Sequence, residues 1–438
     1  MKKTERIDRR MRPRRRGWVA LLPLVFLVLL MIAMAGVMQG FSKVPMTIVF
    51  ALTGIVSLLT LRGYSIEERV RVFSQGAGGS NLLLMVWIFI LAGAFASAAK
   101  TMGAVTATVD LTLMCLPSSI LLAGLFVASC VVSICIGTSV GTIVALVPMA
   151  SEMSVRTGTL LPLMIAAVVG GAFFGDNLSF ISDTTVAATR TQGCSMRDKF
   201  KTNFMIVLPA ALICFAVYVL LGIENGQNTV LVDHQPNLWR VLPYLMVLVT
   251  AIMGMNVLLV LCIGLLLTGV VGIADGAYDM ADWIGAMAEG ITSMGDLILI
   301  SMMAGGLLAV VRCGGGITYL VRGLTRRVSS RRGAECCISA LVALTNCCTA
   351  NNTVAILSIG SITKDISERY GVDKRRAASL LDIFSCVVQG IIPYGAQLLM
   401  ASGLALISPI EIIPYLYYPM ILSVAALLSI ALNKQGRK

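Results

Sequence analysis

Charged residues are scarce in this sequence, and histidine is almost absent. Only 13% of the 438 residues are charged, and His234 is the single histidine. Soluble domains carry about 25% charged residues, so this composition excludes an ordinary soluble domain. With one histidine and no CxxC pair, the twelve cysteines form no zinc motif, and we interpret them as small residues that pack helices. HExxH and GxGD motifs are also missing, so we expect a protein that is not an enzyme and needs no cofactor.

Long apolar segments occupy most of the chain instead. Apolar residues make up 57% of it, and the mean hydropathy is +0.89. The apolar runs reach the length of about 17–25 residues that a helix needs to cross a bilayer. Segments of about ten alternating residues, which would indicate a membrane β-barrel, do not recur. The sequence therefore predicts an all-α, polytopic membrane protein.

The excess of basic residues indicates orientation in the membrane rather than a nucleic-acid partner. The net charge is +12, and Met1–Arg16 alone contain nine Lys and Arg residues. The other basic residues fall mostly in short segments between the predicted spans, where positive charge marks the cytoplasmic side. With the N-terminus inside, 30 of the 34 basic residues are cytoplasmic. We expect a multi-pass inner-membrane protein with both termini in the cytoplasm.

The two halves of the chain have similar patterns. Shifting the sequence by 211 residues places Thr138 on Thr349 and Phe173 on Phe384. Weak internal symmetry of this kind is typical of transporters built from repeats. The predicted units are a basic tail (1–16), a first membrane repeat (17–222), an external linker (223–238), a second repeat (239–433) and a cytoplasmic tail (434–438).

Each half is predicted to hold five transmembrane helices and one re-entrant hairpin. The predicted spans are 18–38, 44–61, 81–99, 159–189 and 203–222, then 239–252, 255–272, 292–311, 376–403 and 412–433. The hairpins are 119–150 and 334–360, and the segments 62–80, 103–117, 273–291 and 314–332 are too short or too polar to cross. Five crossings are an odd number, so the second repeat enters the membrane inverted relative to the first.

Four interruptions break the apolar segments with polar residues, two in each half. Irregular backbone at membrane depth is tolerated only where protein or a wet cavity covers it. Two interruptions are hairpin tips, and two are broken spans at 175–185 and 385–395, the second containing Pro393. We expect them to line a substrate cavity made of Thr138, Ser139, Thr142, Thr349, Asn351, Asn352, Thr353, Asp382, Ser385 and Gln389.

Two carboxylates lie in the first broken span, and they are the candidate ion carriers. Asp176 and Asp183 are seven residues apart among hydroxyl and amide side chains. A charge in the bilayer costs about 3 kcal/mol on insertion scales, so such residues usually have a function. An oxygen-rich setting suits a proton or a small cation. Two close carboxylates are costly to keep ionised together, so a proton and a metal ion would compete for them.

The stretch Gly175–Thr185 closely resembles the GD-x-x-S-P-x-S-D-T-T signature of NhaC-type sodium/proton antiporters, in the ion-transporter superfamily, with Phe180 at the usual proline. The segment 349–353 is similar to the family's Asn-containing hairpin. The resemblance implies a secondary transporter with inverted repeats and re-entrant hairpins, often dimeric. It implies cation binding by Asp176, Asn177, Ser179, Ser182, Asp183 and Thr184, with Asp176 and Asp183 as the metal ligands.

Two transport functions stay open at this point. The first is a Na⁺/H⁺ antiporter that works by alternating access, with the two aspartates carrying the exchanged ions. The second is a Na⁺- or H⁺-coupled transporter of a small organic acid or amino acid, held by Asn351, Asn352 and helix N-termini. The sequence shows no Lys or Arg deep within a span that could neutralise a dicarboxylate, which favours the first function.

Overall fold

The described part of the chain is helical throughout. The computed structural model describes residues 17–40, 43–115, 117–225, 237–326 and 328–432. The basic tail 1–16, most of the linker 223–238 and the segment 434–438 lie outside these residues. Seven helices are long and apolar enough to cross a membrane, or up to eight if the bent pair Ala396–Ala405 and Pro409–Tyr415 is one span. The polytopic, all-α fold is confirmed.

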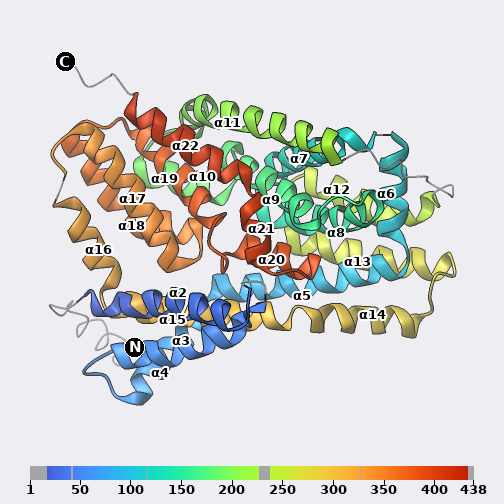
Figure 1. Cartoon of the computed structure of the whole chain (residues 1–438), viewed down its shortest axis with the longest axis horizontal. Helices are drawn as coiled ribbons and strands as arrows, with labels where there is room; N and C mark the ends of the chain where they lie inside the picture. Colours follow the sequence, from blue (N-terminus) through green and yellow to red (C-terminus); the bar gives the residue numbers. More distant parts are fainter. Residues whose placement is uncertain (1–16, 41–42, 116, 226–236, 327, 433–438) are drawn as a thin grey trace.

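The helices form two layers (Figure 1). We call the lower one in this view the scaffold layer. The helices α3, α4 and α15 pack together in it, as do α5, α13 and α14. Its members are α2 (Leu22–Val37), α3 (Met46–Thr60), α4 (Ile66–Ala77), α5 (Ser80–Thr101), α13 (Val257–Ala274), α14 (Met280–Ser293) and α15 (Gly295–Cys313).

The other layer contains all four predicted interruptions, and we call it the site layer. Its first-half helices are α7 (Ser118–Ile136), α8 (Ser139–Thr157), α9 (Leu161–Leu178), α10 (Asp183–Gln192) and α11 (Met196–Asn225). Its second-half helices are α17 (Arg331–Thr349), α18 (Asn352–Tyr370), α19 (Lys374–Gln389), α20 (Ala396–Ala405), α21 (Pro409–Ile412) and α22 (Tyr417–Ala431). The helices α6 (Ala104–Cys115), α12 (Leu238–Ile252) and α16 (Gly316–Thr325) connect the two layers.

The interruptions lie where the sequence predicts them. The backbone leaves the helix at Gly137–Thr138 and at Ala350–Asn351, between the two arms of each predicted hairpin. The broken spans stop at Leu178 and Gln389, and helix resumes at Asp183 and Ala396. Glycine supplies the left-handed turn at Gly137, with φ of 73°, whereas Ala350 adopts the same conformation at 49°.

The helix boundaries recur with an offset of 213 residues, not the 211 inferred from the sequence. The helices α7 and α17 begin at Ser118 and Arg331, and α10 and α20 begin at Asp183 and Ala396. The pairs α8/α18 and α9/α19 have the same offset. Thr138 is therefore equivalent to Asn351 rather than to Thr349. Sequence identities between the halves are too few to detect a shift of two residues.

The two halves interlock within the site layer. The helix α10 packs on α18 and α19, α20 packs on α8, and α11 packs on α22. Each short helix that follows a break thus lies against the other half's hairpin or broken span. This exchange brings residues from distant parts of the sequence into one buried site.

One predicted span in the scaffold layer is longer than expected. The sequence predicts a polar segment 273–291 followed by a span 292–311. The structure has α14 and α15 separated by Met294 alone, and Met280–Cys313 qualifies as a single candidate span. Asp279 and Asp282 form a capping box at the start of α14, which explains the acidic residues there.

Candidate functional site

Close packing of α7 against α9 positions the first broken helix. Ser129 and Ser133 donate hydrogen bonds of 2.6 Å to the carbonyl oxygens of Val168 and Ala172. Gly175 lies in the next turn, where a Cβ atom would overlap Ser133. The glycine therefore lets two helix backbones approach to contact distance one turn before the break.

Asp176 lies in the last turn of α9 and is buried, with 4% of its surface exposed. Its Oδ1 accepts a hydrogen bond of 3.0 Å from the backbone N–H of Ser139. Ser139 begins α8 at the tip of the first hairpin. The helix N-terminus places a partial positive charge at the carboxylate, which stabilises its ionised form. No Lys or Arg nitrogen within the described residues forms an ion pair with Asp176.

The break itself is held by hydroxyl groups. Ser179 donates to the carbonyl oxygen of Ile134 over 2.9 Å, and Ser182 and Thr184 share a hydrogen bond of 3.0 Å. Thr184 and Thr185 both donate to the carbonyl oxygen of Asp176 at 3.4 Å. These contacts fold α10 back on the end of α9.

Asp183 does not join this buried site. It is the first residue of α10, and its side chain is exposed, whereas its neighbours Ser182 and Thr184 are buried. On one continuous helix it would share a face with Asp176, but the break at 179–182 changes the direction of the chain. An acidic residue in the first turn of a helix is stabilised by the helix dipole. The structure thus separates the two carboxylates that the sequence analysis pairs.

A different carboxylate completes the site. Asp382, which the sequence analysis places near the entry of its span, lies midway along α19 and is fully buried. Its Oδ2 is 2.7 Å from the Nζ of Lys199, whose side chain is 1% exposed. Lys199 also donates to the carbonyl oxygen of Asn177 at 2.9 Å and to Thr185 at 2.7 Å. One ammonium group thus connects α11, the first broken span and α19.

The expectation that no basic residue lies deep in the protein is therefore wrong. Lys199 lies near the start of α11, where a lysine is easily interpreted as a cytoplasmic topology signal. Asn203 follows one turn later, and its Nδ2 donates to Asp382 and to the carbonyl oxygen of Asn177, both at 2.8 Å. The i, i+4 spacing of a lysine and an asparagine on an otherwise apolar helix is the signal that was available.

Several buried oxygen atoms around this network have no hydrogen-bond partner in the described part of the chain. Five of them belong to amide and carboxylate groups. Buried polar atoms without a partner are rare in native proteins and call for a missing water or ion. Oxygen atoms of this type are the ligands that Na⁺ and similar hard cations take. The five residues are Asn177, Asn203, Asn346, Asp382 and Gln389.

A second chain of hydrogen bonds joins the two hairpin tips. Gln397 donates to the Oγ of Ser139 at 2.9 Å, and Gln389 donates to Gln397 at 3.0 Å. Gln389 also donates to the carbonyl oxygen of Ala350 at 2.9 Å. Asp176 is thereby linked, through Ser139, to the tip of the second hairpin.

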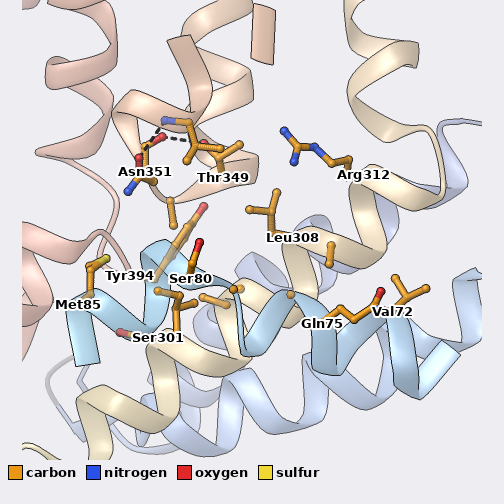
Figure 2. A pocket seen from close by; sticks show the side chains of 18 of the residues that line it. Val72, Gln75, Ser80, Met85, Ser301, Leu308, Arg312, Thr349, Asn351 and Tyr394 are labelled. Carbon is orange, nitrogen blue, oxygen red and sulfur yellow. Dashed lines mark hydrogen bonds between the residues drawn. The ribbon is translucent and has the colours of Figure 1, made fainter. Parts of the chain in front are cut away.

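A cavity of about 540 Å³ opens between that second tip and the scaffold layer (Figure 2). Thr349 and Asn351 line it, as predicted, together with scaffold residues from α4, α5 and α15. The other eight residues expected in a substrate cavity do not line it. Three of them are buried where the site-layer helices meet, namely Asp382, Ser385 and Gln389. Ser139 lies in the hydrogen-bonded chain to Gln397, and Thr142, Asn352, Thr138 and Thr353 lie on the hairpin arms or tips.

The site differs from a metal centre built of charged ligands. Among the described residues, no group of three or more His, Cys, Asp and Glu side chains is placed to hold a metal ion. A cation at Asp176 would draw its remaining ligands from amide, hydroxyl and carbonyl oxygens. Weakly charged oxygen ligands of this kind suit a monovalent cation that must bind and leave.

Broken helices, hairpin tips and buried carboxylates at their meeting point define a secondary transporter. The chain belongs to the Na⁺/H⁺ antiporter family, whose model matches residues 16–223 and 238–435. It is 23% identical over 402 residues to the malate-2H⁺/Na⁺-lactate antiporter of Bacillus subtilis strain 168, covering 83% of this chain and 84% of that protein. It is 25% identical over 401 residues to the Na⁺/H⁺ antiporter NhaC of the same strain (81% and 84%). A match of 22% over 320 residues (65% of each chain) is to the arginine/ornithine antiporter ArcD of Halobacterium salinarum.

Proposed function

We propose that the protein is a Na⁺/H⁺ antiporter in which Asp176 binds either a proton or Na⁺. The observation that carries the proposal is a buried carboxylate at a helix break that has no basic partner among the described residues. An isolated buried carboxylate is costly, so it must take up a proton or a cation. The two occupants exclude one another, which is the requirement for exchange.

The pair Lys199–Asp382 has a positioning role in this proposal. Its charges cancel, so it adds no net charge beside Asp176. Lys199 holds the carbonyl oxygen of Asn177 and the hydroxyl of Thr185, the two ends of the break. Asn177 and Asn203 then offer unpartnered amide oxygens to a cation bound at Asp176. Asp183, exposed beside the break, lies outside this ligand set.

The repeats are proposed to be inverted, each with five spans and one re-entrant hairpin. The equal spacing of helix boundaries in the two halves supports this arrangement. Inverted repeats would let one half rock against the other, so that the site faces each side of the membrane in turn. The proposal includes an inner-membrane location with both termini cytoplasmic, partnership with the lipid bilayer, and a homodimer, and it requires neither a cofactor nor nucleic acid.

Exchange can be tested in proteoliposomes that contain the full chain and carry an imposed pH gradient. Addition of Na⁺ should collapse the gradient with the wild-type protein. Asp176→Asn removes the titrating group at nearly constant volume and should abolish the response. Asp296→Asn is the matched control, because Asp296 lies on a candidate span with an exposed side chain. Full exchange by Asp176→Asn would refute the proposal.

Asp183→Asn distinguishes this site from the carboxylate pair expected from the sequence. If Asp176 carries the ion without Asp183, the Asp183→Asn variant keeps the Na⁺ response with at most a modest change in its Na⁺ dependence. Equal loss of exchange in both variants would restore the paired-carboxylate site.

A coupled organic solute is the second candidate function. The cavity at the second hairpin tip favours it, because exchange of Na⁺ and H⁺ alone needs no space of about 540 Å³. The similarity to an antiporter named for malate and lactate is consistent with this candidate.

A further inference from the structure

The cavity between the scaffold layer and the second hairpin tip carries one positive charge and no negative one. Arg312 is the only charged side chain among the described residues that line it. Figure 2 shows its guanidinium end turned toward Thr349 and Asn351 at the tip. One guanidinium nitrogen donates to the hydroxyl of Ser358 at 2.7 Å, and no carboxylate in the described chain pairs with this arginine. A guanidinium without an acid partner presents two parallel donors to an anion.

A buried hydroxyl without a partner lies in the same cavity. Ser301 lines it from α15 with 6% of its surface exposed, and its Oγ forms no hydrogen bond within the described residues. Most serines in helices of this protein instead donate to a carbonyl one turn earlier, as Ser358 does to Val354. A buried hydroxyl left unbonded is costly unless a ligand or water satisfies it.

The tip of the second hairpin adds further donors. Asn351 uses its Oδ1 to cap α18 through the N–H of Val354, which leaves its Nδ2 to donate elsewhere. The α18 N-terminus therefore lies at the cavity, and Ala396, the first residue of α20, lines it as well. Two helix N-termini and one guanidinium create a positive potential, which selects an anion over Na⁺.

The rest of the lining is apolar. Leu82, Leu308, Val354 and the ring of Tyr394 face the cavity. Ligand sites of about 300–1,000 Å³ usually combine such apolar walls with a few convergent polar groups. Because only one cation is present and no acid, a second carboxylate or an ammonium group on the ligand would be buried without a partner.

We propose that this cavity binds an organic monocarboxylate with an apolar body, whose carboxylate pairs with Arg312 and whose body packs on the leucine, valine and tyrosine walls. The inference rests on the proposed transport function and adds a substrate class to it. The ligand would contact the tip of the second hairpin at Ala350, whose carbonyl oxygen accepts from Gln389. Through Gln397 and Ser139 this contact reaches Asp176, which gives a physical route for coupling the anion to the exchanged cation.

Binding can be measured by equilibrium dialysis on the full chain in detergent, with radiolabelled 4-methylpentanoate as the probe. Leucine has the same body plus an ammonium group, and hexanedioate adds a second carboxylate to a chain of similar length. We expect saturable binding of 4-methylpentanoate, with leucine and hexanedioate at least tenfold weaker. Equal binding of all three, or none of 4-methylpentanoate, would overturn the proposal.

Variants assign the binding to the cavity. Arg312→Gln should weaken 4-methylpentanoate binding at least tenfold, and Arg312→Lys should recover part of it. Arg322→Gln, which removes an exposed charge from α16, is the matched control and should bind as the wild type does. Ser301→Ala removes a hydroxyl that has no structural partner, so a severalfold weakening in this variant cannot come from misfolding. Unchanged binding in both Arg312→Gln and Ser301→Ala would refute the site.

The two proposals can fail separately. Na⁺-driven collapse of the pH gradient without any 4-methylpentanoate binding would leave the cation exchanger intact and remove the carboxylate site. Arg312-dependent binding in a protein that shows no response to Na⁺ would keep the carboxylate site and remove the cation exchanger.

Discussion

The ion pair between Lys199 and Asp382 gives the sharpest test of how the site layer is held together. Lys199→Met removes the ammonium group and keeps most of the side-chain volume. Asp382 then stays fully buried with Asn203 as its remaining side-chain donor of the two. The carbonyl oxygen of Asn177 and the hydroxyl of Thr185 lose a donor as well. The variant should therefore be destabilised through one uncompensated charge and a loosened helix break.

The magnitude follows from measurements on other buried pairs. Removing one partner of a buried ion pair costs about 3–5 kcal/mol, whereas replacing both by apolar residues is often neutral or stabilising. With an unfolding entropy of about 2.1 cal/mol/K per residue, a two-state chain of this length changes Tm by about 1 °C per kcal/mol. Lys199→Met should thus lower Tm by about 3–5 °C, and the double variant Lys199→Met with Asp382→Leu should recover most of the loss.

The assay is thermal unfolding of the purified protein in detergent, followed by tryptophan fluorescence. Lys201→Met, on the same helix two residues further on, removes an exposed lysine and should change the free energy of unfolding by less than about 0.5 kcal/mol. A double variant whose loss equals the sum of the two single losses would show no coupling between the residues. That result would refute the argument that their charges stabilise one another.

Two further predictions concern packing and pH. Gly175→Ala should lower the free energy of unfolding by about 1–3 kcal/mol, because a Cβ there overlaps Ser133, while Gly36→Ala, with no atom within 4 Å of its Cβ, should not destabilise α2; equal thermal stability of the two variants would contradict the packing argument. Hydrogen bonds from Arg240 (2.6 Å) and Asn237 (2.9 Å) lower the pKa of Asp275, which lies just beyond α13. Its folded pKa is below the unfolded value of about 3.9, so this contribution is present above that value and is lost as the pH falls through the folded pKa. The Tm difference between the wild type and Asp275→Asn should therefore shrink between pH 6 and pH 3, and a constant difference would exclude this cause.

The sequence predicts the breaks well because they follow from local chemistry. Glycines, Pro393 and clusters of hydroxyl residues interrupt apolar helices wherever they occur. The partners across each break depend on tertiary packing instead. Asp183 was paired with Asp176 by helical periodicity, which no longer applies once the chain turns at 179–182. Lys199 was assigned to the cytoplasm, since its sequence position alone cannot show that α11 packs it against Asp382.

The offset of 213 residues explains why the two halves divide the chemistry between them. Ser133 donates to the carbonyl oxygen of Ala172, and Asn346, 213 residues later, donates to that of Ser385 at 2.7 Å. The two broken helices thus share one hydrogen-bonded frame. At the end of that frame, however, the first half has Asp176 and the second has Gln389.

A carboxylate and its isosteric amide can occupy equivalent places, but only the carboxylate attracts a cation or a proton. Gln389 instead donates to the hairpin tip at Ala350, beside the cavity that carries the charge of Arg312. The repeated frame therefore places a negative site in one half and a positive cavity next to the other. A pseudo-symmetric protein with this division is built to handle two solutes of opposite charge, and the short chain of hydrogen bonds between the tips connects their binding.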